Sequence, residues 1–258
     1  MHQTIAELNC FKIAANKSFT KTKFSLSSKC AWGDPVTMSQ AIKTDAYYFF
    51  LSRHHRKIRD ELNARIRALS EDDEDYDLIA SYCVALITTA VSYMECRINE
   101  FWLGVLNDGI DSQGLTAHQK KQFKEMATRV DWKWENILDK YQLALKILGL
   151  PVFDKGRHPF QAADSLVLLR NEVVHNVPWG IELLEGKRIS KQSKLEARLQ
   201  RLIGKCPYEG LKIYFPENCL HQDCAEWAST TSQEFVDKFL LRAGANTKVY
   251  VSGGIFRM

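Results

Sequence analysis

Residues 159–178 read PFQAADSLVLLRNEVVHNVP, and this stretch predicts one helix around which the rest of the fold is organised. Proline is favoured in a first helical turn, so Pro159 suits the start, and Asp164 and Ser165 suit the nearby amides that lack partners. The residue before a proline avoids the α region, so we expect the helix to end near Asn176. Its apolar residues recur at helical spacing and predict a core face: Leu166, Leu169 and Val173.

Three polar residues interrupt the apolar pattern near the end of this helix: Arg170, Asn171 and His175. At about 100° per residue, Asn171 and His175 lie roughly 40° apart around the helix axis, on nearly one face. Arg170 lies roughly 140° from His175, so its long side chain must swing to reach the same edge. Unpaired carbonyls in the last turn favour a positive charge, which suits His175 as a general acid or a phosphate partner.

An earlier helix, predicted over residues 77–107, is the most apolar of the chain. Glu95 and Asn99 are four residues apart on one face of it. A carboxylate among apolar residues needs a partner. Either Glu95 or Asn99 orients Arg170 or His175, or the two belong to a structural ion pair or a solvent-facing edge.

The segment Arg170-Asn-Glu-Val-Val-His175 resembles the RNxxxH form of the motif of the HEPN superfamily. The segments before it also follow the order of that family: the helix with Ser92, Glu95 and Asn99, then WENILDKY at 134–141, then PFQ at 159–161. The resemblance covers about residues 40–180.

Members of this superfamily are all-helical, usually dimeric domains found in RNA-cleaving toxins and antiviral defence systems. The resemblance therefore implies a metal-independent endoribonuclease, with no cofactor, acting on RNA as a homodimer, with an antitoxin or sensor protein as a further partner. It implies that His175 moves protons, Arg170 grips the phosphate and Asn171 positions either group, with Glu95 and Asn99 in support. The alternative is a non-catalytic dimerisation or interaction module in which these side chains form a buried polar network.

The composition agrees with a folded domain, since 45% of the 258 residues are hydrophobic. The net charge of +4 permits nucleic acid as a partner without arguing for it. An odd number of scattered cysteines, seven, favours a reducing cytoplasm over a disulfide framework. The apolar run 78–91 contains polar residues and is too short for a membrane span. Phosphate-binding loops, dinucleotide fingerprints, HExxH and nucleophile elbows do not occur in the sequence.

We therefore predict an all-α fold, a HEPN-like helical bundle with an N-terminal extension and a small C-terminal β-hairpin. The predicted division is an N-terminal arm over 1–36, the helical core over 37–180 and a basic helical extension over 181–258. The hairpin is expected around Gly253-Gly254.

Basic residues gather in several places, and each group has two interpretations: an RNA-binding patch or the solvated side of a helix. One group lies in the helix predicted to end near residue 69: Arg53, His54, His55, Arg56, Lys57 and Arg59. The other RNA-binding candidates flank the central helix: Arg157, His158, Lys187, Arg188 and Lys191.

A further alternative rests on residues whose side chains can bind zinc: Cys206, Cys219, His221 and Cys224. Their spacing is not that of a standard zinc knuckle, and buried free thiols are the competing interpretation. The site predicted here contains no metal.

Overall fold

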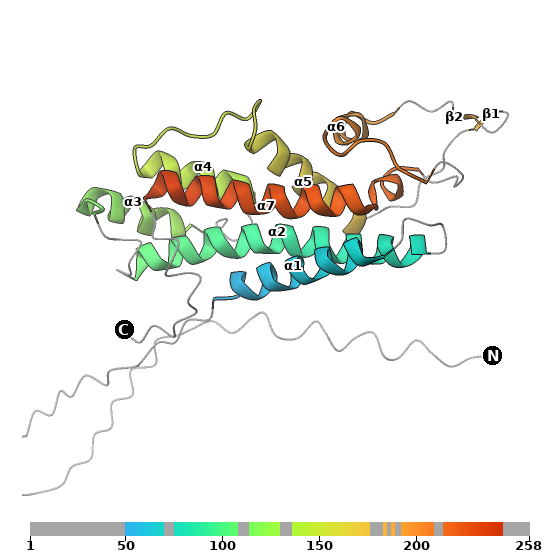
Figure 1. Cartoon of the computed structure of the whole chain (residues 1–258). Helices are drawn as coiled ribbons and strands as arrows, with labels where there is room; N and C mark the ends of the chain where they lie inside the picture. Colours follow the sequence, from blue (N-terminus) through green and yellow to red (C-terminus); the bar gives the residue numbers. More distant parts are fainter. Residues whose placement is uncertain are drawn as a thin grey trace, which may run out of the picture. The chain divides into compact units, whose positions relative to one another are not determined.

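The computed structural model describes residues 50–69, 75–107, 114–129, 136–175, 192–208 and 214–244, together with two short strands. The described residues are mostly helical, so the all-α prediction is confirmed (Figure 1). The strands β1 (Leu183–Leu184) and β2 (Lys187–Arg188) form an antiparallel pair. The predicted arm over 1–36 and the hairpin around Gly253-Gly254 lie outside the described residues.

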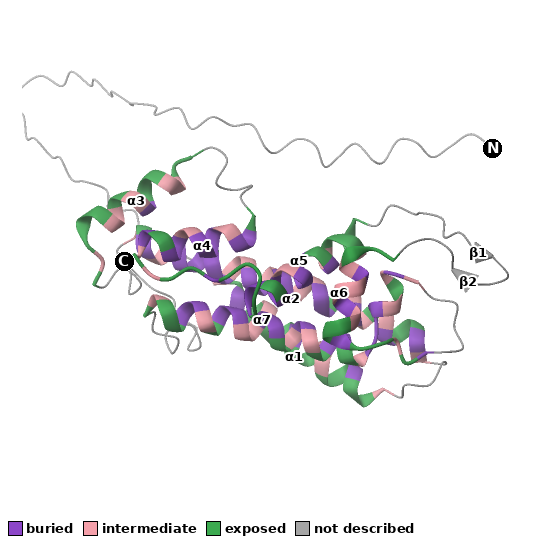
Figure 2. Cartoon of the chain, turned by 90° about the horizontal axis from the view of Figure 1, so that it is seen from above, coloured by how far each residue is buried: buried purple, intermediate pink, exposed green. Residues whose placement is uncertain are grey.

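The longest helix, α2 (Tyr76–Leu106), contacts α1 (Ser52–Ala68), α5 (Phe160–Val174) and α7 (Gln222–Ala243). Its apolar residues are distributed around most of its circumference, so it is buried by neighbours on several sides. Buried residues concentrate where the helices face one another (Figure 2). By length and composition alone α2 is also apolar enough to cross a membrane. The apolar composition of α2 is explained by its packing against these three helices.

Three shorter helices complete the described bundle: α3 (Ala117–Ala127), α4 (Ile137–Ile147) and α6 (Lys194–Ile203). Each begins at a polar residue whose side chain accepts a backbone N–H of the first turn: Thr116, Asn136 and Ser193. A short 3-10 helix, η4 (Glu217–Cys219), precedes α7.

Aromatic rings from α4 and α7 fill the centre of the bundle. Tyr141 is fully buried, and its hydroxyl donates to the Met94 carbonyl of α2 at 2.7 Å. Its ring lies edge-on to Phe235 and Phe239, at centroid distances of 4.9 and 4.7 Å. Tyr141 is therefore a core residue. Because α7 supplies these partners, the C-terminal part of the chain helps to form the helical core rather than extending from it.

The first turn of α1 is held by a carboxylate from α2. Leu51 provides no side-chain cap, and the first turn of α1 contains no acidic residue. Instead Glu100, only 6% exposed, accepts from the backbone N–H of Ser52 at 2.9 Å and from its hydroxyl at 2.6 Å. Arg97 donates to the same carboxylate at 3.0 Å. Glu100 thus accepts a hydrogen bond from a backbone N–H at the start of α1 and also neutralises the buried cation of Arg97.

Replacing this carboxylate should be costly. Glu100→Ala leaves the buried guanidinium of Arg97 without its counter-charge, so we expect a loss of about 3–5 kcal/mol in the free energy of unfolding. Urea denaturation measures it. The control is Glu125→Ala, because Glu125 lies 3.7 Å from Lys121 with both side chains exposed. That variant should lose under about 0.5 kcal/mol. Equal losses in the two variants would contradict the role of Glu100.

Candidate functional site

The helix α5 presents the predicted catalytic residues at its C-terminal end. Leu166 and Leu169 are fully buried and Val173 packs partly against the core, so the predicted core face is confirmed. The helix ends at Val174, and the N–H of His175 donates to the Asn171 carbonyl at 2.9 Å. His175 is therefore the residue that caps the helix end.

The three motif side chains differ in their exposure. Asn171 and His175 are exposed, and Arg170 is partly buried. The Nε atom of Arg170 is shielded from solvent and has no hydrogen-bond partner among the described residues. A guanidinium N–H without a partner is costly, but an acceptor from a ligand or a second protein reaches this shielded donor only after the side chain moves.

Contacts within and beyond the helix hold α5 in place. The Asp164 carboxylate accepts from Arg198 of α6 at 3.0 Å, and the Ser165 hydroxyl donates to the Gln161 carbonyl at 2.8 Å. Both side chains were expected to serve the unpaired amides of the first turn. Their actual partners lie elsewhere, because the first turn begins at Phe160 and both residues lie beyond it.

The predicted supporting residues make no hydrogen bond to the motif among the described residues. Asn99 is exposed, and its side-chain oxygen accepts from Lys140 of α4 at 3.3 Å. Glu95 is partly buried. In the part of the chain that the structure describes, neither side chain hydrogen bonds to Arg170 or His175.

The packing of α5 agrees with this absence of hydrogen bonds among the described residues. Phe160, at the start of α5, and Tyr141 pack on the same phenylalanine ring of α7, and Tyr141 bonds to the Met94 carbonyl. The start of α5 is thus linked through these rings to Met94, the residue before Glu95. Arg170 is about 15 Å further along the helix, at 1.5 Å per residue.

The RNA-binding candidates just before α5 already have acidic partners. Arg157 lies 3.3 Å from the carboxylate of Asp154, and His158 Nε2 lies 2.9 Å from Glu234 of α7. Hydrogen bonds from Lys238 and then from His158 lower the pKa of Glu234. Among the candidates after α5, Lys187 and Arg188 form strand β2, and Lys191 lies outside the described residues.

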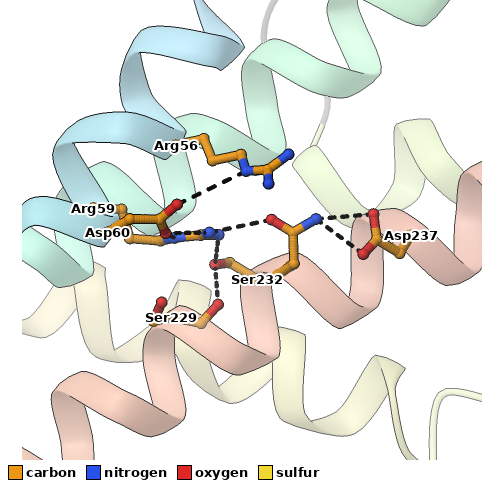
Figure 3. A network of polar contacts seen from close by, with 7 residues as sticks. Arg56, Arg59, Asp60, Ser229, Ser232 and Asp237 are labelled. Atoms are coloured by element: carbon orange, nitrogen blue, oxygen red, sulfur yellow. Dashed lines mark hydrogen bonds and ion pairs between the residues drawn. The ribbon is translucent and has the colours of Figure 1, made fainter. Parts of the chain in front are cut away.

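A charged cluster joins α1 to α7, and the sequence analysis, which took Arg59 as part of a basic patch, did not predict its partners on α7. Arg59 was grouped with the basic side of its helix, yet it is 3% exposed. It bonds to Asp60 at 2.6 Å, to Ser232 at 3.0 Å and to Gln233 at 3.1 Å (Figure 3). Sequence periodicity did not identify the burial of Arg59, because its partners Ser232 and Gln233 are about 170 residues away in the chain.

Next to this cluster lies a cavity of about 730 Å³ between α1, α2 and α7. Charged residues of both signs line it together with four uncharged ones: Ser52, Arg53, Arg56, Lys57, Asp60, Glu61, Tyr93, Arg97, Gln233, Asp237 and Leu240. The sequence already indicated the basic residues of this cavity. Arg53, Arg56 and Lys57 follow the i, i+3, i+4 spacing of a single helix face.

Two of the three cysteines of the zinc alternative are buried thiols, and Cys206 is partly buried. Cys219 and Cys224 are free and buried, and burial raises the pKa of Cys219 to about 12. Without a bound metal, such thiols stay protonated near neutral pH. Within the described ranges, no cluster of three or more histidine, cysteine or acidic residues could hold a metal ion. His221 is 1% exposed, and neither ring nitrogen has a hydrogen-bond partner there.

Comparisons with models of known protein families, with curated proteins and with solved structures find no match.

The buried imidazole of His221 should make the fold sensitive to acid. Burial lowers its pKa below the ordinary value of 6.5, against a smaller opposing effect of Asp223. The unfolded chain therefore binds the proton more readily, and stability is lost as the pH falls below about 6.5. We expect His221→Leu to reduce the difference between the unfolding free energies at pH 7.5 and pH 5.5.

Urea denaturation at both pH values checks this expectation. His118→Ala is the control, because His118 is exposed on α3. It should keep the wild-type difference. An unchanged difference in His221→Leu would show that His221 does not contribute.

Proposed function

We propose that the chain is a metal-independent endoribonuclease of HEPN type, acting as a toxin or antiviral defence effector. The observation that carries the proposal is the end of α5. There His175 and Asn171 are exposed beside Arg170, whose Nε lacks a partner among the described residues. An acid–base group, an amide and a guanidinium at one helix end meet the needs of phosphodiester cleavage.

In this mechanism the ribose 2′-oxygen attacks the adjacent phosphorus while the bond from phosphorus to the 5′-oxygen breaks. His175 takes a proton from the attacking hydroxyl or gives one to the departing 5′-oxygen. Arg170 donates to the phosphate oxygens, where negative charge accumulates. Asn171 positions the phosphate by a hydrogen bond. The products are a 2′,3′-cyclic phosphate and a 5′-hydroxyl, and DNA, which lacks the nucleophile, is not cut.

A second copy of the chain would supply the other proton-transfer group. Leu168 and Val174 are 38% and 45% exposed, and they flank Asn171 on α5. Exposed apolar residues beside polar ones are typical of an association surface. Pairing two copies through this surface brings two His175 side chains together, so one can act as base and the other as acid.

The same apolar residues favour the second candidate function, a non-catalytic dimerisation module. In that case Arg170, Asn171 and His175 are buried on association and fix one packing arrangement. The two functions differ in whether RNA is cut, which the following variants test.

His175→Ala should reduce RNA cleavage at least about a hundredfold, because proton transfer by a positioned side chain contributes roughly 10²–10⁴-fold. His175 is exposed, so the free energy of unfolding should change by less than about 0.5 kcal/mol. The assay uses cellular RNA with EDTA present. His118→Ala, another exposed histidine variant, should retain wild-type activity. Full activity in His175→Ala would refute the assignment of this residue.

Leu168→Glu should convert the dimer to a monomer and abolish cleavage, because a charge replaces an apolar contact on both copies. Size-exclusion chromatography with light scattering measures the oligomeric state. Leu241→Glu is the control, since Leu241 on α7 is 80% exposed and does not adjoin the motif. A Leu168→Glu protein that remains dimeric would place the association surface elsewhere.

A further inference from the structure

The cavity between α1, α2 and α7 has the size and the polar lining of a small-molecule site. Its volume of about 730 Å³ falls within the range of ligand pockets, roughly 300–1,000 Å³. Glu100, Ser52 and Arg97 fix the wall positions of α1 and α2 through buried hydrogen bonds. The walls are therefore held by the core rather than by mobile surface contacts.

One wall of the cavity has more cationic than acidic side chains. Arg53, Arg56 and Lys57 line it from α1 beside Asp60 and Glu61, and the buried Arg97 joins them from α2. Lys57 has no acidic partner among the described residues. Arg56 Nε lies 3.8 Å from Asp60, too far for a charge-assisted hydrogen bond. This wall can therefore bind the oxygens of a phosphate group.

The opposite wall accepts hydrogen bonds. Asp237 of α7 lines the cavity, and both of its carboxylate oxygens accept from the Gln233 amide at 2.9 Å. Figure 3 shows the two dashed lines that end at Asp237. Within the described residues it has no cationic partner. Each oxygen keeps acceptor capacity for an N–H group of a ligand, such as an amine or ring nitrogen of a nucleobase.

A buried hydroxyl lies between these two walls. Tyr93 lines the cavity, is 4% exposed and makes no hydrogen bond to any described residue. Burial raises the pKa of its phenol, while Arg97 opposes the rise and Asp237 adds to it. Charged residues from both walls thus affect the pKa of the same hydroxyl. The hydroxyl can therefore donate to, or accept from, a group that enters the cavity.

We infer that this cavity binds a mononucleotide, with its phosphate against Arg56 and Lys57, its base against Asp237 and Tyr93 between them. The mononucleotide matches the cavity in size and in its two ends, one anionic and one rich in hydrogen-bond donors. The site shares no residue with the end of α5, so this inference does not rest on the proposed nuclease.

Isothermal titration calorimetry of the full chain with the four ribonucleoside 5′-monophosphates, and with inorganic phosphate, tests the inference. At least one nucleotide should bind more tightly than phosphate. Lys57→Gln and Tyr93→Phe should each weaken its binding, Lys57→Gln about tenfold, as expected for a lost hydrogen bond to a charged group. Asp237→Asn should weaken nucleotide binding and leave phosphate binding unchanged.

The control is Arg65→Gln, which removes an exposed cation of α1 that pairs with Glu61 and does not line the cavity. It should bind like the wild type. Absence of nucleotide binding at millimolar concentration would overturn the inference, as would binding that Lys57→Gln and Tyr93→Phe leave unchanged. If Arg65→Gln weakened nucleotide binding as much as Lys57→Gln, the attraction would be due to general charge. If inorganic phosphate bound as tightly as every nucleotide, the base would make no contribution. Either result overturns the inference.

Discussion

The carboxylate of Glu100 is the interaction on which the arrangement of α1 depends. It supplies the negative charge that the first turn of α1 lacks, and it neutralises Arg97 within the core. A carboxylate that is buried without such partners would be strongly destabilising. Because Glu100 belongs to the most buried helix, α1 is fixed against α2 at one end, and its basic face is directed toward α7.

The bundle separates two chemically different regions. At the end of α5, the motif residues lie outside the core, with His175 at the helix terminus and Arg170 partly buried beside it. Between α1 and α7, the charged groups form a network around a cavity instead. The first region is exposed at a helix terminus, whereas the second lines a cavity that is partly open to solvent.

Local patterns predicted the helices well, because apolar spacing and capping residues act within a few turns. Leu166 and Leu169 were assigned to the core from spacing alone, and both are fully buried. The same reasoning could not identify the important carboxylate of α2. Glu95 and Glu100 both lie on a helix surrounded by neighbours, so periodicity does not decide which one is buried. The deciding partner, Ser52, is 48 residues away.

Long-range contacts also limited what could be predicted of the candidate site. The motif at Arg170, Asn171 and His175 is local and was identified from the sequence. Whether Glu95 or Asn99 orients the motif residues could not be predicted, because that depends on how α5 packs along α2. Likewise, the basic spacing of α1 was visible, but the cavity exists only because Tyr93 and Asp237 face that helix.

The central claim is that His175 and Arg170 cleave RNA by attack of the neighbouring 2′-hydroxyl. The most direct measurement is the chemical identity of the new ends, determined by mass spectrometry after digestion of a defined RNA in EDTA. The account predicts 2′,3′-cyclic phosphate and 5′-hydroxyl ends, and no cleavage where a single 2′-deoxy nucleotide replaces the residue before the scissile bond. Ends with 5′-phosphate and 3′-hydroxyl groups, or cutting at the 2′-deoxy position, would contradict it.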